Sequence, residues 1–243
     1  MRPGGCVPTV GLMPAVAAVT RHTAESEQCF LAYAAHELRT PIATQRALLE
    51  LALSDPNADV TAWREIGRDL LGVCSRQERL VESCLILARS QGGPQRREPV
   101  DLAAIAADAL ALQDRRELEH VVDLEPARTT GDPDLLGRLA ANLVSNAIRH
   151  NVEGGRIEVA TRTEARLAVL TVANTGPPIA AGELRRLFLP FQRLASRSAS
   201  AADGVGLGLA IVEAIADAHG ATLTARPGTP GGLAIAVSFR ARD

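Results

Sequence analysis

The sequence predicts a fold of two unlike parts, a helical hairpin followed by an α+β domain. Three observations support this. Residues 21–91 carry apolar residues at alternating three- and four-residue steps, and short strands alternate with amphipathic helices from about residue 99. Between them, "SQGGPQRRE" (90–98) combines glycine, proline and charge, which is typical of a linker. The predicted divisions are a weakly patterned leader (1–20), the hairpin (21–91), the linker (92–98) and the second domain (99–243).

Each predicted helix of the hairpin has a narrow apolar seam, and the turn "SDPNADV" (54–60) separates the two helices. The first seam has Gln45 as its polar member and the second has Gln77. The apolar members are Leu31, Ala35, Leu38, Ile42 and Leu49, then Ile66, Leu70, Val73, Leu80, Cys84 and Leu87. Because two such helices bury little apolar surface alone, we expect the hairpin to dimerise into a four-helix bundle.

The second domain is predicted as an α+β layer. Helices are expected at 100–113, 132–151 and about 207–219. Strands are expected at 120–126, 156–163, 166–174, 221–227 and 233–241. Residues 175–203 lack such patterning, and a segment of that length favours a functional loop over a simple connection.

The composition excludes several classes of function. All 26 basic side chains are arginine and 28 are acidic, so the net charge of −2 gives no case for binding nucleic acid or an anionic membrane. The four cysteines form no CxxC pair, which favours free thiols in a reducing compartment. The apolar stretch at 7–19 is interrupted and shorter than the ~20 residues of a membrane span. We therefore expect a soluble, cytoplasmic chain without a direct membrane span.

His36 stands in "HELRTP" (36–41) on the first helix of the hairpin. At 100° per residue it points about 200° away from Leu38 in the seam. Glu37 is its neighbour, and Thr40 follows one turn later on the same outward face. This position suits chemistry in solution; a merely solvated histidine is the alternative that the helix alone leaves open.

Asn142 and Asn146 are one turn apart on the predicted 132–151 helix, and Arg149 and His150 follow one turn later. Amide oxygens and a guanidinium on one face suit phosphate oxygens and a hard divalent ion. An ordinary amphipathic helix is the alternative. Asparagine is a poor helix former, however, so an aligned pair in mid-helix calls for a reason.

Glycines mark two further segments. Gly204, Gly206 and Gly208 stand directly before the predicted 207–219 helix, where backbone N–H groups could meet a phosphate chain. This segment does not follow a strand of a βαβ unit, so it fails the test for a dinucleotide fold. Asn174 and Gly176, in "VANTGPPI" (172–179), form a turn at the end of a predicted strand.

The order of these blocks resembles the transmitter region of two-component sensor histidine kinases, from about residue 25 to residue 243. "HELRTP" (36–41) is similar to the H box of that family and "NLVSNAIRHN" (142–151) to its N box. "NTGPPI" (174–179), "LFLPFQR" (187–193) and "GVGLGL" (204–209) are similar to its first glycine box, F box and second glycine box. Five blocks in the family's order and spacing make the resemblance very specific.

The resemblance implies a homodimeric protein histidine kinase. It assigns His36 as the nucleophile toward the γ-phosphate of ATP, with Glu37 accepting the Nδ1–H and holding the tautomer. Phosphate would then pass to an aspartate of a response regulator receiver domain. Thr40 matches the position that orients the water hydrolysing the phosphorylated regulator. Pro41 would bend the helix just past His36.

For the second domain the resemblance implies a Bergerat-type α/β-sandwich ATPase, with ATP between the N-box helix and a lid at 177–205. Asn146, with Asn142, would present oxygen to Mg²⁺, while Arg149 and His150 would meet phosphates or ribose. The remaining ATP-binding residues would be Asn174, Gly176, the lid anchors Phe188 and Phe191, and Gly204, Gly206, Gly208 and Leu209.

Two departures from the family pattern matter. Asn174 stands where the family has an aspartate that accepts the adenine amine, and Pro178 replaces a glycine. Exchanging a charged acceptor for a neutral one predicts adenine binding weaker by ~1 kcal/mol. Upstream, only a short leader precedes the hairpin, so the sensor is expected to be a separate protein, or the chain to be part of a longer one.

Two alternatives remain at this point. One is a related Bergerat-fold ATPase or serine kinase, against which the intact H box argues. The other is a catalytically weak scaffold or phosphatase-biased partner of another kinase, which Asn174 and the missing sensor keep open.

Overall fold

The computed structural model describes residues 35, 37–54, 59–91, 94, 96–113, 118–192 and 206–242. The chain divides into two compact units, Met1–Cys74 and Ser75–Asp243, and the division falls inside helix α2 (Val60–Gln91). Among the residues that the structure describes, no helix combines the length and apolar character needed to cross a membrane.

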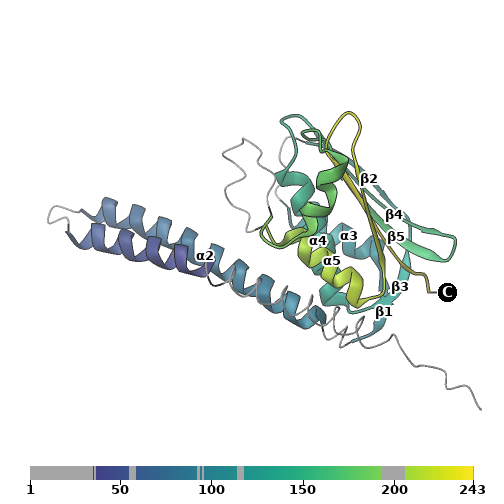
Figure 1. Cartoon of the computed structure of the whole chain (residues 1–243), viewed down its shortest axis with the longest axis horizontal. Helices are drawn as coiled ribbons and strands as arrows, with labels where there is room; N and C mark the ends of the chain where they lie inside the picture. Colours follow the sequence, from purple (N-terminus) through teal and green to yellow (C-terminus); the bar gives the residue numbers. More distant parts are fainter. Residues whose placement is uncertain are drawn as a thin grey trace, which may run out of the picture. The chain divides into compact units, whose positions relative to one another are not determined.

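The hairpin consists of a helix over residues 37–54 and the first half of α2, which lie side by side (Figure 1). The carboxylate of Asp59 accepts the Ala62 N–H at 2.8 Å and so caps the start of α2. Gln45, the polar member of the first seam, donates from Nε2 to the Cys74 sulfur at 3.2 Å. The predicted pair of helices is therefore confirmed. The first predicted seam is only partly buried, because Ile42 and Leu49 are exposed and the buried residue in the described part of that helix is Ala52.

Much apolar surface of the hairpin stays uncovered in a single chain. Ala52 and Val73 are buried, but Ile42 of the predicted seam is 56% exposed and Leu71 is 68% exposed. Leu31 lies outside the described residues. Exposed leucine and isoleucine at this density indicate a face that another surface covers.

The thiols of α2 are free, as the sequence predicts. Cys74 and Cys84 are half-buried, and burial raises the pKa of the Cys84 thiol above its ordinary value. Such a thiol is a weak nucleophile at neutral pH. Cys6 and Cys29 lie outside the described residues.

The described strands of the second unit form a five-stranded sheet in the order β2-β4-β5-β7-β6. Strand β2 (Glu119–Leu124) is parallel to β4 (Arg156–Glu164), and the other neighbours are antiparallel. The remaining bounds are β5 (Leu167–Asn174), β6 (Thr222–Pro227) and β7 (Leu233–Arg240). All five strands match their predicted positions within two residues.

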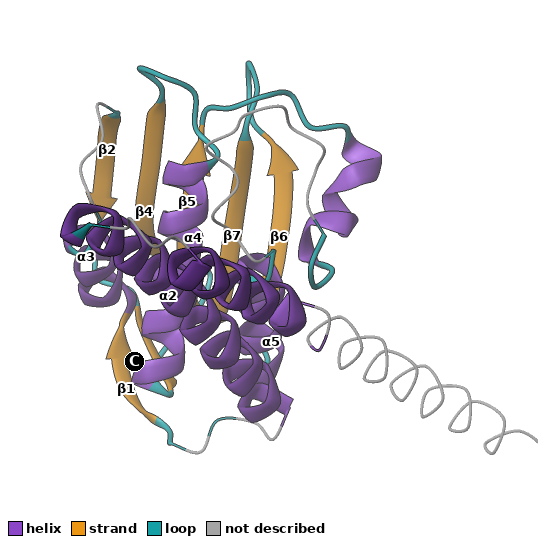
Figure 2. Ribbon diagram, turned by 90° about the vertical axis from the view of Figure 1, so that its left-hand side faces the viewer, coloured by secondary structure: helices purple, strands orange, loops and turns teal. Residues whose placement is uncertain are grey.

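Helices α3 (Leu102–Ala111), α4 (Pro133–Arg149) and α5 (Gly208–Ala218) cover one face of this sheet (Figure 2). The strands turn alternate residues toward the helices, as in β4, where Ile157 and Val159 are buried. The core is mainly aliphatic, in keeping with an aromatic content of only 2%. The predicted α/β-sandwich is thus confirmed.

A second, two-stranded sheet was not expected. It pairs β1 (Glu98–Asp101) with β3 (Arg128–Gly131), and an isolated bridge from Thr129 to Ala241 links β3 to the end of the β7 strand. Four-residue strands are too short to show alternation, and Pro99 argues against a strand in sequence analysis. Residue 98, expected in the linker, belongs to this sheet.

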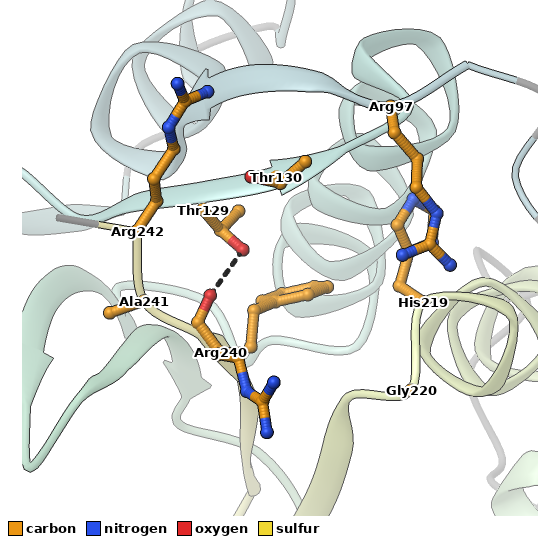
Figure 3. Close-up of a pocket in the computed structure, with 9 residues that line it drawn as sticks. Arg97, Thr129, Thr130, His219, Gly220, Arg240, Ala241 and Arg242 are labelled. Atoms are coloured by element: carbon orange, nitrogen blue, oxygen red, sulfur yellow. Dashed lines mark hydrogen bonds between the residues drawn. The ribbon is translucent and has the colours of Figure 1, made fainter.

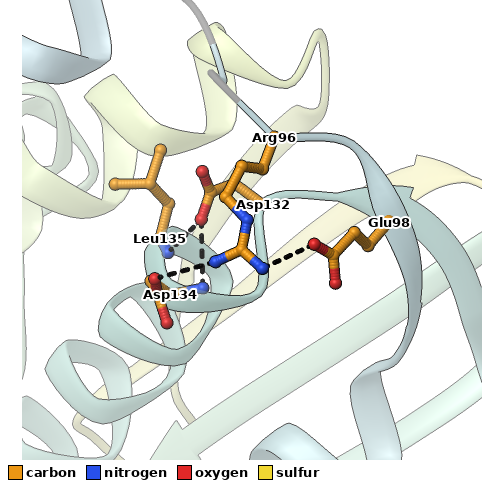
Figure 4. A network of polar contacts seen from close by, with 5 residues as sticks. All are labelled: Arg96, Glu98, Asp132, Asp134 and Leu135. Atoms are coloured by element: carbon orange, nitrogen blue, oxygen red, sulfur yellow. Dashed lines mark hydrogen bonds and ion pairs between the residues drawn. The ribbon is translucent and has the colours of Figure 1, made fainter.

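The start of α4 is capped as "GDPD" suggests. Asp132 accepts the N–H groups of Asp134 and Leu135 at 3.1 and 3.2 Å, and proline occupies the first helical position. Arg96 connects Glu98 at 2.6 Å with Asp134 at 3.7 Å (Figure 4). These ion pairs are exposed and add little stability, but they link the beginning of β1 to the first turn of α4.

The segment expected to be irregular, 175–203, contains a 3₁₀ helix, η1 (Ala181–Phe188). Leu184 and Leu187 are half-buried and Phe188 is buried, at the spacing of one helical face. The prediction was wrong for this part of the segment because one apolar turn is too short a pattern to separate from a loop.

Candidate functional site

Two predicted site residues, His36 and Gly204, lie outside the described residues. Their neighbours in the H box are described: Glu37 and Thr40 are helical and exposed, and the Thr40 carbonyl accepts the Thr44 hydroxyl at 3.1 Å. Glu37 and Thr40 therefore lie on a solvent-facing helix surface, as the sequence predicts.

Asn142 lies in the middle of α4 and Asn146 in its last turn, and both are half-buried. The Asn142 Nδ2 donates to the Arg138 carbonyl at 2.8 Å, which leaves its Oδ1 as the outward acceptor. This Oδ1 lies 3.3 Å from the place of a Cβ on Gly208. The Asn146 side chain has no hydrogen-bond partner among the described residues. Two amide oxygens are thus available on this face of α4.

The beginning of α5 meets the same face. Its N-cap residue, Leu207, offers no side-chain acceptor, so the first N–H groups of the helix are not capped by it. Gly208 lies against the Asn142 oxygen, and a larger residue would crowd it. Leu209, the next residue, is buried and anchors the helix in the core. The N-terminus of α5 and the Asn142 oxygen therefore adjoin each other, with Asn146 one turn further along α4, an arrangement suited to phosphates with a divalent cation.

Asn174 ends strand β5 and is only 8% exposed. Its Nδ2 donates to the carbonyls of Thr175 at 2.7 Å and His150 at 3.4 Å. These two bonds orient the amide, so that Oδ1 is left as an acceptor; it has no partner among the described residues and is not sealed from solvent. Gly176 is required beside it, because a Cβ there would lie 2.8 Å from the His150 carbonyl.

The C-terminal end of α4 is joined to this turn. Arg149 is half-buried and His150 is exposed as the C-cap of the helix. Through its carbonyl, His150 accepts the bond from Asn174. The N box and the first glycine box, which are 24 residues apart, therefore form one continuous rim.

The F box and the second glycine box are also in contact. Phe188 is buried, and Phe191 is half-buried with a positive φ of 62°. The Phe191 N–H donates to the Gly206 carbonyl at 2.9 Å. Gly206 has φ of 74°, and a Cβ there would lie 3.1 Å from the Phe191 Cα. The conformation and this close approach both require glycine.

Sequence reasoning missed two supporting residues, Thr175 and Asn151. The Thr175 hydroxyl donates to Asn151 Oδ1 at 2.6 Å and accepts the Arg156 N–H at 2.7 Å. These bonds hold the turn after Asn174 against the end of the N box. Their positions could have indicated this role, because Thr175 and Asn151 stand at the ends of a predicted strand and a predicted helix, where hydroxyl and amide side chains often bond the backbone.

The donor set limits which metal the site could hold. Within the described residues, no three His, Cys, Asp or Glu side chains gather as metal ligands. The amide oxygens of Asn142 and Asn146 are hard ligands that fit Mg²⁺, an ion that keeps several waters and shares substrate phosphates.

Comparison with known proteins identifies the family. A profile described as "Histidine kinase-, DNA gyrase B-, and HSP90-like ATPase" matches residues 131–243, and one described as "His Kinase A (phospho-acceptor) domain" matches residues 26–93. The chain belongs to the sensor histidine kinases. The predicted family is thereby confirmed.

Curated relatives share both parts. Sensor protein CutS of Streptomyces coelicolor is 45% identical over 219 residues, which cover 88% of this chain and 53% of CutS. The histidine-protein kinase/phosphatase MprB of Mycobacterium tuberculosis is 34% identical over 207 residues, covering 82% of this chain and 41% of MprB. The chain spans about half the length of these relatives.

Solved structures of histidine kinases are similar to this chain as well. The mycobacterial sensor histidine kinase MprB structure has 33% identity and a TM-score of 0.55, covering 60% of this chain and 99% of that one. The Acinetobacter baumannii histidine kinase AdeS, at 22% identity, has a TM-score of 0.67 and covers 86% of this chain and 98% of that one. AdeS supports the fold, a helical hairpin followed by an α/β domain.

Proposed function

We propose that this histidine kinase binds ATP in its second unit, phosphorylates His36 and passes the phosphate to an aspartate of a response regulator. The observation that carries the proposal is the meeting of the Asn142 oxygen with Gly208 at the start of α5. Both belong to predicted nucleotide-binding boxes, and together they provide oxygen ligands and free backbone N–H groups at one point.

Within this proposal the orientation of the Asn174 amide determines which of its atoms bonds adenine. Its Nδ2 is occupied by two backbone carbonyls. Its Oδ1 therefore accepts the exocyclic amine of adenine, while Arg149 and His150 face the ribose or phosphates. Phe188 and Phe191 anchor the segment that closes over the nucleotide. Asn142 and Asn146 would hold Mg²⁺, which neutralises charge on the phosphates.

The transfer follows from imidazole chemistry. The lone pair of His36 Nε2 attacks the γ-phosphorus, the bond from phosphorus to the β-γ bridging oxygen breaks, and ADP leaves with that oxygen. The Nδ1–H of the resulting imidazolium is held by the carboxylate of Glu37. In the second step the phosphoryl group moves from nitrogen to an aspartate oxygen of the regulator.

Two further roles belong to the same proposal. Thr40 is exposed one turn after His36 and would orient a water that hydrolyses the phosphorylated regulator. The relative MprB is named as a kinase/phosphatase, which supports a dual role. The uncovered leucines and isoleucines of the hairpin support a homodimer. In the cell we expect the chain in the cytoplasm, working with a sensor segment or protein.

The decisive experiment incubates the purified protein with labelled ATP and Mg²⁺. We expect acid-labile, base-stable label on the wild type and none on His36→Gln, because phosphohistidine is lost in acid. His120→Gln, which changes an exposed histidine of β2, is the matched control and should keep the label. Label that survives on His36→Gln, or that is stable in acid, would contradict the proposal.

One observation favours a second candidate, a catalytically weak scaffold or phosphatase-biased partner of another kinase. It is the neutral acceptor Asn174 in place of aspartate. An unlabelled wild type that is dimeric and still accelerates loss of phosphate from a regulator would favour this candidate over the kinase.

A further inference from the structure

A cavity of about 390 Å³ lies at the C-terminal end of α5, the opposite end from Gly208 (Figure 3). Its wall is formed by the segment before β1, by β3, by the end of α5 and by the end of β7. The lining residues are Arg97, Thr129, Thr130, His219, Gly220, Phe239, Arg240, Ala241 and Arg242. Three of them are arginines and none is acidic.

The three arginines have no acidic partner among the residues that the structure describes. In the described part of the chain, Arg97, Arg240 and Arg242 form no salt bridge, whereas the neighbouring Arg96 is paired with Glu98. Arg97 comes from the segment before β1, whereas Arg240 ends β7 and Arg242 follows directly after it; the three stand on different sides of the cavity (Figure 3). Guanidinium groups that are not paired within a protein suit carboxylate or phosphate from outside it.

His219 lines this cavity as a neutral side chain and does not add to its positive charge. Its Nδ1 faces the Ile215 carbonyl at 2.8 Å, and its Nε2 accepts the Asp132 N–H at 3.0 Å. Both ring nitrogens are therefore occupied, in the neutral tautomer protonated at Nδ1. Burial and the nearby Arg97 lower the pKa of His219, which keeps the ring neutral.

The threonines differ in what they offer. The Thr129 hydroxyl donates to the Arg240 carbonyl at 2.9 Å, so its proton is used. The Thr130 hydroxyl has no hydrogen-bond partner within the described residues and can donate into the cavity. The donors available to a ligand are thus one hydroxyl and three guanidinium groups.

This cavity is separate from the nucleotide site. Helix α5 has 11 residues, so at 1.5 Å per residue its two ends are about 16 Å apart. The cavity also adjoins the N-terminal end of α4, through the bond from Asp132 to His219, while Asn142 and Asn146 lie further along that helix.

We propose that this cavity binds a small phosphate-bearing anion. The formal charge of three guanidinium groups exceeds that of a single carboxylate, and a phosphate or pyrophosphate matches it better. A phosphate also offers several oxygens to donors on different sides, whereas a planar carboxylate offers two in one direction. The arginine side chains must lose rotamer freedom to close around the ligand, so the binding is weak and depends on salt.

Pyrophosphate titrated into the full chain, followed by calorimetry and by backbone amide NMR, tests this proposal. We expect shifts at Thr130, Gly220 and Ala241, and a dissociation constant at least fivefold larger for Arg240→Gln/Arg242→Gln. Arg64→Gln/Arg68→Gln removes two exposed arginines of α2 and is the matched control, expected to leave binding unchanged. Arg242→Gln alone, at an exposed residue, guards against a folding defect of the double variant.

Three results would overturn the proposal. Shifts confined to Gly206, Gly208 and their neighbours would place the anion in the nucleotide site. Equal loss of affinity in the α2 control would show that binding depends on the total positive charge of the protein and not on this cavity. Tighter binding of malonate than of pyrophosphate would show that the cavity prefers a dicarboxylate to a phosphate.

Discussion

At the scale of single residues, Asn174 stabilises the fold through one end of its amide and is proposed to bind adenine through the other. Its Nδ2 bonds two backbone carbonyls, and its Oδ1 stays available as an acceptor. An aspartate in the same place would offer a charged acceptor but no donor. Under the proposed function, asparagine at this position binds adenine more weakly than aspartate would but stabilises the turn more.

We predict that Asn174→Asp tightens ATP binding by about 1 kcal/mol, or about fivefold, because a charged acceptor replaces a neutral one. The same change lowers the free energy of unfolding by about 1 kcal/mol, because the Thr175 and His150 carbonyls lose their donor. Calorimetric titration with ATP and denaturant unfolding measure the two effects separately. An unchanged dissociation constant would count against the role given to Oδ1.

Gly206 is the second residue whose type is dictated by its surroundings. We predict that Gly206→Ala destabilises the second unit by about 1–3 kcal/mol, because φ is 74° and the new Cβ meets Phe191. ATP affinity should fall with it, since the contact joins two nucleotide boxes.

Gly137→Ala is the control for that variant. Gly137 lies on α4 with no atom within 4 Å of its Cβ position, so alanine should stabilise the helix by up to about 1 kcal/mol. Thermal unfolding in the absence of nucleotide compares the two. Equal stability of Gly206→Ala and wild type would contradict the strain argument.

At the scale of elements, His219 links the beginning of α4 to the end of α5. It accepts the backbone N–H of Asp132, which is also the N-cap of α4, and it packs edge-on against Phe239. Gly131 is confined by the same ring, since a Cβ there would lie 2.8 Å from His219 Cδ2. A proton on Nε2 would remove the acceptor that holds this junction.

We predict that stability falls as the pH drops below 6.5, the ordinary pKa of histidine, toward the lower folded-state pKa of His219. In that window the unfolded chain binds a proton that the folded chain does not, so stability rises with pH; the contribution is fully present above 6.5. Chemical unfolding between pH 5 and 8 measures it. His219→Gln should flatten this part of the profile and His120→Gln should not.

At the scale of the whole molecule, the two units differ in how completely each buries its own apolar side chains. The second unit buries its own aliphatic core between a sheet and helices, whereas the hairpin leaves large apolar side chains exposed. Ile42 and Leu71, both in the first unit, are 56% and 68% exposed. Such uncovered apolar side chains on the hairpin indicate a face for a second copy of the chain.

We predict that Leu71→Glu weakens dimerisation by at least about 1.5 kcal/mol, the value of burying one leucine side chain. Leu112→Glu changes a leucine that is 80% exposed beyond the end of α3 and should leave the dimer intact. Sedimentation velocity over a concentration series separates the two variants. A dimer equally weakened by both changes would contradict an interface on this face of α2.

The sequence by itself determined the hairpin, the main sheet, its helices and the family to which the chain belongs. Hydrophobic periodicity marks helices and strands of six or more residues, and the boxes carry unusual residues such as the Asn142–Asn146 pair. Only the tertiary structure decided the rest: the β1–β3 sheet, η1, the orientation of the Asn174 amide and the arginine-lined cavity. The β1–β3 sheet, the bond from Asn174 to His150 and the cavity depend on contacts between segments far apart in the chain, such as Thr129 with Arg240, and local patterning carries no information about such contacts. The helix η1 was missed for a local reason, because its apolar pattern is too short.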